Sequence, residues 1–481
     1  MEKQQAPTLF PIGLYPGNAI SPVDGRYREK TEALAPYFSE SGLMKYRLLV
    51  SVEYFIALSD MAKIIRPLGK AELRFLRSLY RFFSDDDYAA IKEIEKTANH
   101  DVNAVVRFLK KRLENHKTLY VLSEFVHFGL TSEDINNLAY AFQLRGGLTL
   151  LATGYEAVMA ELLSELVKPH AWTSMLAHTH GQPASPTTVG WEAHVFYHRL
   201  YPIYKELMRM SILVKFGGAT GGHNALNIAY PEIDWRNFSK KFIARINRIH
   251  DSNLKLLPFV CNPYTTQVEP HDTYGCLFDT IKRANTVLID LCRDVWTYIS
   301  MDYFKQKPNP EEDGSSAMPN KVNPIDFENA EGNFGLANMF CEFFSHDLPL
   351  SRMQRHLTDS TIIRNFGTAF SHTVIALAAV EKGLGKIYVN SEDLLFFLNN
   401  NWSVVAEAYQ TILRKYGVTK SYDLLKKATR GKEVDRKTMM VFAGQVVKEN
   451  GLPESVYEEL LAVTPMNYIG DRTTPFSGKK P

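Results

Sequence analysis

The residues best suited to chemistry lie at 314–324, in the most irregular part of a mostly helical sequence. Their polar side chains are two adjacent hydroxyls, a lysine and an asparagine: Ser315, Ser316, Lys321 and Asn323. Prolines exclude a continuous helix here, and a helical pattern carrying Glu328 and Asn329 resumes afterwards. A polar loop that enters a helix suits anion binding through backbone N–H groups and the helix dipole. Composition alone, however, favours an ordinary solvated loop.

Polar and titratable residues also gather at other breaks in the helical pattern. They are Arg26, Tyr27, Asn99, His100, Asp101, Thr131, Ser132, His178, His180, Gln267, Arg355, Ser360 and Arg364. Ordinary roles explain several of them, because His100 could cap a helix and Thr131 to Asp134 resembles a capping box. The charges at 352–364 could simply solvate a helix face. Helix N-termini also bind carboxylates, so capping and function are compatible.

Metal and redox chemistry have little support in the sequence. His178 and His180 form a His-x-His pair, which is weak evidence for a metal without a third ligand. The four cysteines form no C-x-x-C pair and have no zinc-ligand spacing with a histidine: Cys261, Cys276, Cys292 and Cys341. They predict buried thiols in a reducing cytosol. These residues therefore give no positive evidence for a metal or a redox site.

Length and composition narrow the class of protein. The 481 residues suffice for two to four domains, and 45% hydrophobic with 22% charged residues is typical of soluble globular chains. A net charge of +2, from 55 basic and 53 acidic residues, gives no global argument for nucleic-acid or membrane binding. No signal peptide is evident, and no stretch approaches the roughly 20 apolar residues of a membrane helix. We expect a cytoplasmic protein.

Long helices must position these residues. Apolar side chains repeat at helical spacing from Tyr155 to Leu166 and from Ile281 to Ile299. Alternation with period two is confined to short pieces near 264–268. The sequence therefore predicts an all-α protein. Its wide apolar seams favour association between helix bundles and hence a homo-oligomer.

Several boundaries follow from the same pattern. We expect an N-terminal helical domain at 1–120, a central long-helix bundle at 121–372 with the loop 308–324, and a C-terminal helical domain at 373–481. The helical pattern at 190–215 contains Pro202, which should kink it. Glycines at 217, 218, 221 and 222 predict a flexible turn near the substrate. The Pro/Gly/Lys tail from Thr473 is expected to be disordered.

The loop at 314–324 reads Gly-Ser-Ser-x-Met-Pro-x-Lys-x-Asn-Pro. It resembles the signature of the fumarase/aspartase superfamily, whose members eliminate fumarate from succinyl-type substrates. Eight fixed positions over eleven residues make a chance match improbable. Four further motifs occur in the family's order: Asp-Gly-Arg-Tyr from Asp24, Asn-His-Asp from Asn99, Thr-Ser-Glu-Asp-Ile-Asn from Thr131 and Thr-His-Gly-Gln from Thr179. Together they are similar to adenylosuccinate lyases of the longer bacterial type.

The resemblance spans residues 24 to about 416 and carries expectations for the fold. It implies three helical domains, with a central bundle of long helices that packs into the core of a homotetramer. It also implies active sites that each draw on three subunits, and no cofactor. Residues 317–320 read Ala-Met-Pro-Asn where many bacterial relatives have Thr-Met-Pro-His, so the side contacts of the loop are expected to differ.

The resemblance also implies roles for individual residues. Ser315 would take the Cβ proton, His180 would be the general acid, and Glu328 would orient His180. His100 is a second candidate on the leaving-group side. A lone serine is a poor base, so the loop must exclude water and supply positive groups such as Lys321. Substrate-binding roles are implied for Arg26, Tyr27, Asn99, His100, Asp101, Thr131, Ser132, Gln267, Ser316, Lys321, Asn323, Asn329, Arg355, Ser360 and Arg364.

The implied reactions belong to purine biosynthesis. Such a protein would split adenylosuccinate into AMP and fumarate, and the succinylated aminoimidazole-carboxamide ribotide into the carboxamide ribotide and fumarate. Two alternatives stay open. One is a sister lyase acting on argininosuccinate, malate or aspartate, although these substrates carry no phosphate for the arginines at 351–364. The other is a catalytically silent relative, although such a protein would not need to keep Ser315, His180 and Lys321.

Overall fold

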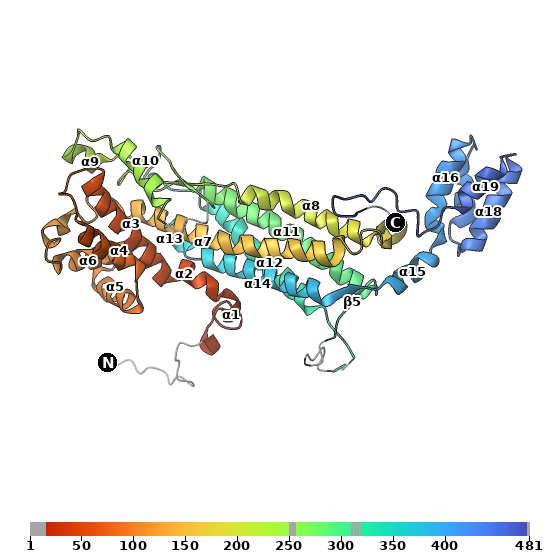
Figure 1. Cartoon of the computed structure of the whole chain (residues 1–481), viewed down its shortest axis with the longest axis horizontal. Coiled ribbons are helices and arrows are strands. Elements are labelled where there is room, and N and C mark those ends of the chain that lie inside the picture. The colour runs from red at the N-terminus through yellow and green to blue at the C-terminus, as the bar shows by residue number, and fades with distance from the viewer. Residues whose placement is uncertain (1–15, 250–255, 309–310, 312–316, 319, 479–481) are drawn as a thin grey trace. The chain divides into compact units, whose positions relative to one another are not determined.

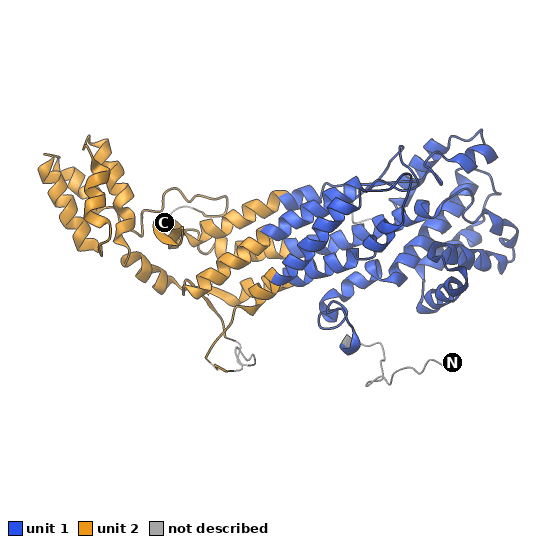
Figure 2. Ribbon diagram, turned by 180° about the vertical axis from the view of Figure 1, so that it is seen from behind, with its two compact units in different colours: residues 1–155, 203–286, 332–377 blue, residues 156–202, 287–331, 378–481 orange. Residues whose placement is uncertain are grey.

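The structure is a computed structural model that describes residues 16–249, 256–308, 311, 317–318 and 320–478 (Figure 1). Long helices dominate this part of the chain, and its strands are short, which confirms the all-α class. The described residues divide into two compact units, each built from three stretches of sequence (Figure 2). Unit 1 comprises residues 1–155, 203–286 and 332–377, and unit 2 comprises residues 156–202, 287–331 and 378–481. The three predicted domain boundaries stay a prediction.

The helices fall into three groups. Those within unit 1 are α1 (Arg28–Thr31), α2 (Ala35–Phe38), α3 (Glu40–Asp60), α4 (Lys70–Arg81), α5 (Asp85–Ala98), α6 (Asp101–Glu114), α9 (Asn224–Ala229), α10 (Trp235–Ile246) and α13 (Thr358–Ile363). Those within unit 2 are α15 (Ser391–Asn399), α16 (Ala406–Lys415), α17 (Ser421–Thr429), α18 (Arg436–Glu449) and α19 (Glu454–Leu461). Helices with residues in both units are α7 (Ser132–Glu161), α8 (Val189–Leu207), α11 (Asp272–Ser300), α12 (Ile325–Asp347) and α14 (Phe366–Lys386).

Helix α3 forms the centre of unit 1 and packs against α4 and α6. From Gly42 to Ser59 every residue except Lys45 is buried. Apolar side chains on all faces of a helix require such complete burial. Two charged residues, Arg47 and Glu53, are buried with them and each finds partners of opposite charge. A charged group can enter a core only when it is paired in this way.

The predicted apolar seams are buried in the structure. In α11, Ile281, Ala284, Leu288, Leu291 and Val295 are buried, and Ile299 at the end of the helix is half-buried. In α7 and the π-helical turn that follows it, the buried set is Tyr155, Val158, Leu162 and Leu166. The 3.6-residue period of these side chains therefore reports the buried faces of the long helices correctly.

Three two-stranded sheets interrupt the helices of the described chain. Strands β1 (Ser174–Thr179) and β2 (Gln182–Thr188) form an antiparallel hairpin, and β5 (Phe304–Gln306) pairs antiparallel with β6 (Ile387–Val389). Strand β3 (Ile212–Val214) pairs parallel with β4 (Phe259–Cys261). The short pieces of period-two alternation near 264–268 are not strands in the structure, where most of these residues form bends.

Two further expectations needed correction. The helix predicted over 190–215 is shorter in the structure. Helix α8 continues through Pro202 and ends at Leu207. The tail is not disordered over its described residues up to 478. Trp172 Nε1 donates to the Ser477 carbonyl at 3.0 Å, and Thr474 is 9% exposed. Hydrogen bonding and burial of the backbone decide whether a terminus is ordered, and composition does not report them.

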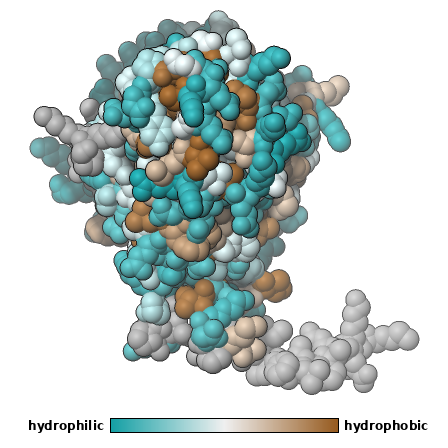
Figure 3. All heavy atoms as spheres, turned by 90° about the vertical axis from the view of Figure 1, so that its right-hand side faces the viewer, coloured by the Kyte–Doolittle hydropathy of each residue, from teal (hydrophilic) through white to brown (hydrophobic). Residues whose placement is uncertain are grey.

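Figure 3 views the end of unit 2 to which the C-terminal helices belong, and hydrophilic side chains cover most of this face, with hydrophobic ones scattered among them. No helix in the described ranges is long and apolar enough to span a membrane.

Candidate active site

One cavity in unit 1 brings together nine of the predicted substrate-binding residues. They are Asn99, His100, Asp101, Thr131, Ser132, Gln267, Arg355, Ser360 and Arg364. The cavity has a volume of about 580 Å³, which is within the range of small-molecule sites. Its walls come from the α5–α6 junction, the start of α7, the loop before α11 and the segment around α13.

The α5–α6 junction supplies Asn99, His100 and Asp101. Asn99 ends α5 in the left-handed conformation, with φ of 48°, which asparagine tolerates. His100 then caps α6, because its Nδ1 accepts the Asn103 N–H at 3.3 Å. That bond places the proton of the neutral imidazole on Nε2, which becomes a donor. Capping and cavity lining therefore coexist in His100.

The N-terminus of α7 forms a second wall. Thr131 precedes this helix and Ser132 begins it, and both line the cavity. The Asp134 carboxylate accepts the Thr131 N–H at 2.9 Å, which is one half of the predicted capping box. A 30-residue helix presents the positive end of its dipole here, so the wall favours an anionic ligand.

Arginines and carboxylates alternate along the cavity. Asp101 Oδ2 lies 2.8 Å from both Arg47 Nη2 and Arg364 Nη2. Burial alone would raise the pKa of Asp101, but the charge of Arg47, the Val102 N–H and the charge of Arg364 outweigh it and lower this pKa to about 2. Asp101 was predicted to contact substrate, and in the structure its carboxylate holds two arginines.

Arg355 has its own acidic partners. Its Nη1 lies 3.1 Å from Glu133 Oε1 and 3.4 Å from Gln267 Oε1, and its Nη2 lies 3.9 Å from Asp359 Oδ1. Gln267 in turn donates to the Ala219 carbonyl at 3.2 Å. Guanidinium groups fixed in this way present planar forks that match phosphate or carboxylate oxygens. The cavity can therefore hold a ligand with more than one anionic group.

His180 lies in unit 2, at the tip of the β1–β2 hairpin. Thr179 pairs with Gln182, so His180 and Gly181 are the two turn residues, and their φ values are 53° and 73°. Positive φ at both positions is the mark of the tight turn that joins hairpin strands. A histidine in this conformation is uncommon. The imidazole is exposed.

Glu328 does not orient His180 within the described chain. Its Oε1 accepts a hydrogen bond from Trp296 Nε1 at 3.0 Å, and no hydrogen bond or ion pair joins it to His180 in the described ranges. Lys321 is exposed, while Asn323 and Asn329 are half-buried. Ser315 and Ser316 lie outside the described residues. His180, Glu328, Lys321, Asn323 and Asn329 all belong to unit 2.

Arg26 and Tyr27 form a turn before α1, where the guanidinium carbon of Arg26 lies 6.0 Å from the centre of the Tyr27 ring. Neither residue lines the cavity described above. Their predicted role in phosphate binding stays a prediction.

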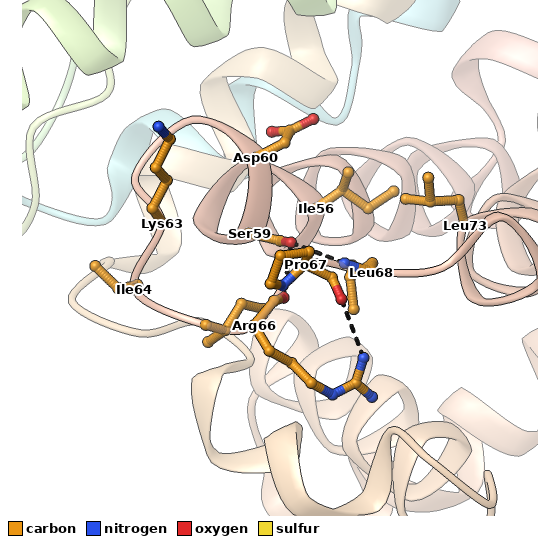
Figure 4. Close-up of a pocket in the computed structure, with 10 residues that line it drawn as sticks. Ile56, Ser59, Asp60, Lys63, Ile64, Arg66, Pro67, Leu68 and Leu73 are labelled. Atoms are coloured by element: carbon orange, nitrogen blue, oxygen red, sulfur yellow. Dashed lines mark hydrogen bonds between the residues drawn. The ribbon is translucent and has the colours of Figure 1, made fainter.

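A second cavity of about 670 Å³ follows the end of α3 (Figure 4). Three of its polar side chains are engaged within the protein. Ser59 Oγ accepts the Leu68 N–H at 3.1 Å, Arg66 pairs with Glu72 at 2.7 Å, and Asp60 pairs with Arg245 at 2.8 Å. None of the predicted site residues lines it. The smaller cavity is therefore the candidate site.

Comparison with known proteins assigns the family. Residues 25–337 match the family model described as "Lyase", and residues 351–469 match the one described as "Adenylosuccinate lyase C-terminal". The chain is 43% identical over 458 residues to an adenylosuccinate lyase of Escherichia coli (strain K12), with 95% of this chain and 97% of the relative covered. It is 44% identical over 468 residues to one of Dictyostelium discoideum, with 94% and 96% covered. This chain belongs to the adenylosuccinate lyase family.

Solved structures support the fold of this family member. A fumarate lyase from Mesorhizobium sp. BNC1 matches with a TM-score of 0.72 at 17% identity, over 92% of this chain and 95% of that one. A 3-carboxy-cis,cis-muconate lactonizing enzyme from Pseudomonas putida matches with a TM-score of 0.72 at 18% identity, over 92% and 94%. The family models and the curated relatives confirm the predicted superfamily, and the chain is an enzyme of the lyase class.

Sequence reasoning missed several polar residues of this lyase cavity: Arg47, Glu95, Asn136 and Tyr140. Asn136 stood within the motif that starts at Thr131 and could have been included. Arg47 is 1% exposed, and its charge inside an apolar helix was a signal, because a buried arginine needs partners. Tyr140 has a buried hydroxyl with no hydrogen-bond partner in the described structure, and burial raises its pKa to about 12.

The described ranges contain no group of three or more histidine, cysteine, aspartate or glutamate side chains placed to hold a metal ion. The four cysteines are free, and Cys292 and Cys341 are buried.

Proposed function

We propose that this protein cleaves adenylosuccinate to AMP and fumarate, and the succinylated aminoimidazole-carboxamide ribotide to the carboxamide ribotide and fumarate, by anti β-elimination. The carrying observation is the cavity in which Arg47, Arg355 and Arg364 lie beside the N-terminus of α7, in a chain 43% identical to an adenylosuccinate lyase. Both substrates combine a phosphate with two carboxylates. Three arginines and a helix N-terminus suit such a ligand.

The proposed reaction breaks the C–N bond and forms the double bond of fumarate. Ser315 takes the Cβ proton, and the electron pair of that C–H bond forms the double bond as the nitrogen leaves. His180 donates a proton to the departing nitrogen, which would otherwise leave poorly. Lys321 and backbone N–H groups stabilise the negative charge that develops on the substrate carboxylate.

A homotetramer with shared active sites is part of the proposal. The nine cavity residues belong to unit 1, whereas His180, Glu328 and Lys321 belong to unit 2. An exposed histidine is a weak acid catalyst in water, and a second chain covering it would exclude solvent. The free cysteines are in keeping with a cytoplasmic location.

The test is an absorbance assay of the purified protein with adenylosuccinate, beside argininosuccinate, malate and aspartate. We expect loss of adenylosuccinate with equal release of fumarate, and no turnover of the other three. Turnover of argininosuccinate, malate or aspartate in place of adenylosuccinate would agree with the elimination chemistry but would show that the substrate is not a nucleotide. A Ser315→Ala protein with undiminished turnover would overturn the assignment of the base.

A further inference from the structure

Six side chains in and behind the cavity wall form one continuous series of hydrogen-bond donors and acceptors. In order they are Arg355, Glu133, Asn136, Arg47, Asp101 and Arg364. All six belong to unit 1, and Glu133 alone does not line the cavity. The series links every arginine of the cavity wall to a carboxylate or amide oxygen.

Each neighbouring pair from Arg355 to Arg47 in this series lies within hydrogen-bond distance. Glu133 Oε1 lies 3.1 Å from Arg355 Nη1 and accepts from Asn136 Nδ2 at 2.7 Å. Asn136 Oδ1 accepts from Arg47 Nε at 2.9 Å. One carboxylate oxygen thus holds Arg355 directly and holds Arg47 through a single amide.

The chemistry of these groups fixes their orientation. An arginine can only donate and an ionised carboxylate can only accept, so the Asn136 amide has one permitted orientation between Arg47 and Glu133. A neutral amide in place of the Glu133 carboxylate could still accept from Asn136, which Arg47 keeps in the same orientation. Arg355, however, would lose its charged partner and would be drawn toward Asp359, whose Oδ1 lies 3.9 Å from Nη2.

Glu133 is buried behind the cavity wall, where its carboxylate contacts other protein side chains and does not reach the cavity. It is 1% exposed, and its Oε2 has no hydrogen-bond partner in the described structure. A carboxylate buried this deeply costs stability unless its charge is used, and its ion pair is with Arg355.

We propose that Glu133 is a positioning residue that holds the Arg355 guanidinium in the orientation that receives the phosphate of the nucleotide substrate. This rests on the proposed function, because it takes the cavity ligand to be a phosphorylated succinyl-purine. Glu133 touches neither the substrate nor the reacting atoms. It acts on ligand selection, so its removal affects phosphorylated ligands more than unphosphorylated ones.

The test compares Glu133→Gln with the unchanged protein on two substrates, adenylosuccinate and succinyladenosine, which lacks only the 5′-phosphate. We expect the KM for adenylosuccinate to rise about 10- to 100-fold, the range for one hydrogen bond between charged groups. We expect kcat, and kcat/KM for succinyladenosine, to change by less than about threefold. Equal losses of kcat/KM on the two substrates would overturn the proposal.

Glu53→Gln is the matched control. Glu53 is also buried in unit 1 and pairs with Arg77 and Arg245 at 2.8 and 3.2 Å, but it does not line the cavity. We expect this variant to lower the Tm without changing the ratio of kcat/KM between the two substrates. A ratio that fell as far as in Glu133→Gln would show a general response to lost buried charge and would overturn the proposal.

Binding of AMP, measured by calorimetry, separates this proposal from the proposed function. If the unchanged protein releases no fumarate from adenylosuccinate, the function fails, yet weaker AMP binding by Glu133→Gln still supports the role of Glu133. Unchanged AMP affinity overturns it. Should Glu133→Gln not fold, Glu133→Asp keeps the charge but withdraws it by one methylene, and the same weakening of AMP binding is expected.

Discussion

Lys215 and Asp134 form an ion pair in which both side chains are fully buried, with 2.8 Å between Nζ and Oδ1. The same carboxylate accepts N–H groups from Thr131, Gly217 and Gly218 at 2.9 to 3.1 Å. It therefore ties the first turn of α7 to the glycine turn that follows β3. The sequence predicted a flexible turn at those glycines, and in the structure the N–H groups of Gly217 and Gly218 donate to this buried carboxylate. The predicted flexibility stays a prediction.

Asp134→Asn should destabilise the protein strongly, because it leaves the Lys215 ammonium buried without a counter-charge. We expect a loss of about 3–5 kcal/mol in the free energy of unfolding, measured by urea titration. Lys215→Met should cost a similar amount for the same reason. The double variant should recover much of the loss, since no lone charge remains. A double variant whose loss equals the sum of the single losses would show that the two residues act independently.

Glu269 should make stability depend on pH. Burial raises its pKa from 4.5 to about 7, although the Asn262 amide and the His271 N–H partly oppose the rise. Between pH 4.5 and 7 the folded protein keeps the Glu269 proton, whereas the unfolded chain releases it. The contribution of Glu269 to the free energy of unfolding therefore falls as pH rises through this range. A pKa shift of this size changes the free energy of unfolding by about 3 kcal/mol across the titration.

Glu269→Gln removes this titration. The variant should match the unchanged protein near pH 4.5 and become more stable than it by up to about 3 kcal/mol at pH 8. Urea denaturation across this range measures the difference, and the measurement at pH 4.5 is its own control. A difference that does not vary with pH would contradict the raised pKa.

His180→Asn should abolish most activity without affecting the fold. Asparagine accepts positive φ, so the hairpin turn is kept, while the proton donor is lost. We expect kcat to fall by about 10²- to 10⁴-fold, and stability to change by less than about 0.5 kcal/mol. His178→Asn is the control, because His178 is on the same hairpin but was predicted to be peripheral. Near-normal elimination by His180→Asn would transfer the acid role to His100.

Mixing two inactive variants tests whether active sites are shared between chains. His180→Asn removes a residue of unit 2, and Arg355→Met removes one of unit 1. In randomly mixed oligomers, a site that takes these residues from different chains has both intact in about a quarter of cases. We expect that fraction of the original activity after co-expression. Mixed oligomers with no recovered activity would mean that both residues come from one chain.

The sequence by itself determined the family, the helical class and most of the cavity wall. The motifs around His100 and Thr131 stand at helix ends, where caps and left-handed residues are set by the nearest few residues. Such local rules can be read without knowing the fold. The spacing of apolar residues likewise identified the buried faces of α11, because helical geometry alone produces it.

Only the tertiary structure decided how distant charges pair. Arg47 meets Asn136 across 89 residues of sequence, and no local pattern specifies that contact. The hairpin that carries His180 was missed because strand pairing between two short segments, one containing two prolines, overrides their weak strand propensity. The tail is ordered because Ser477 meets Trp172 across 305 residues. Each outcome depends on which surfaces become neighbours when the chain folds, and that information is not local.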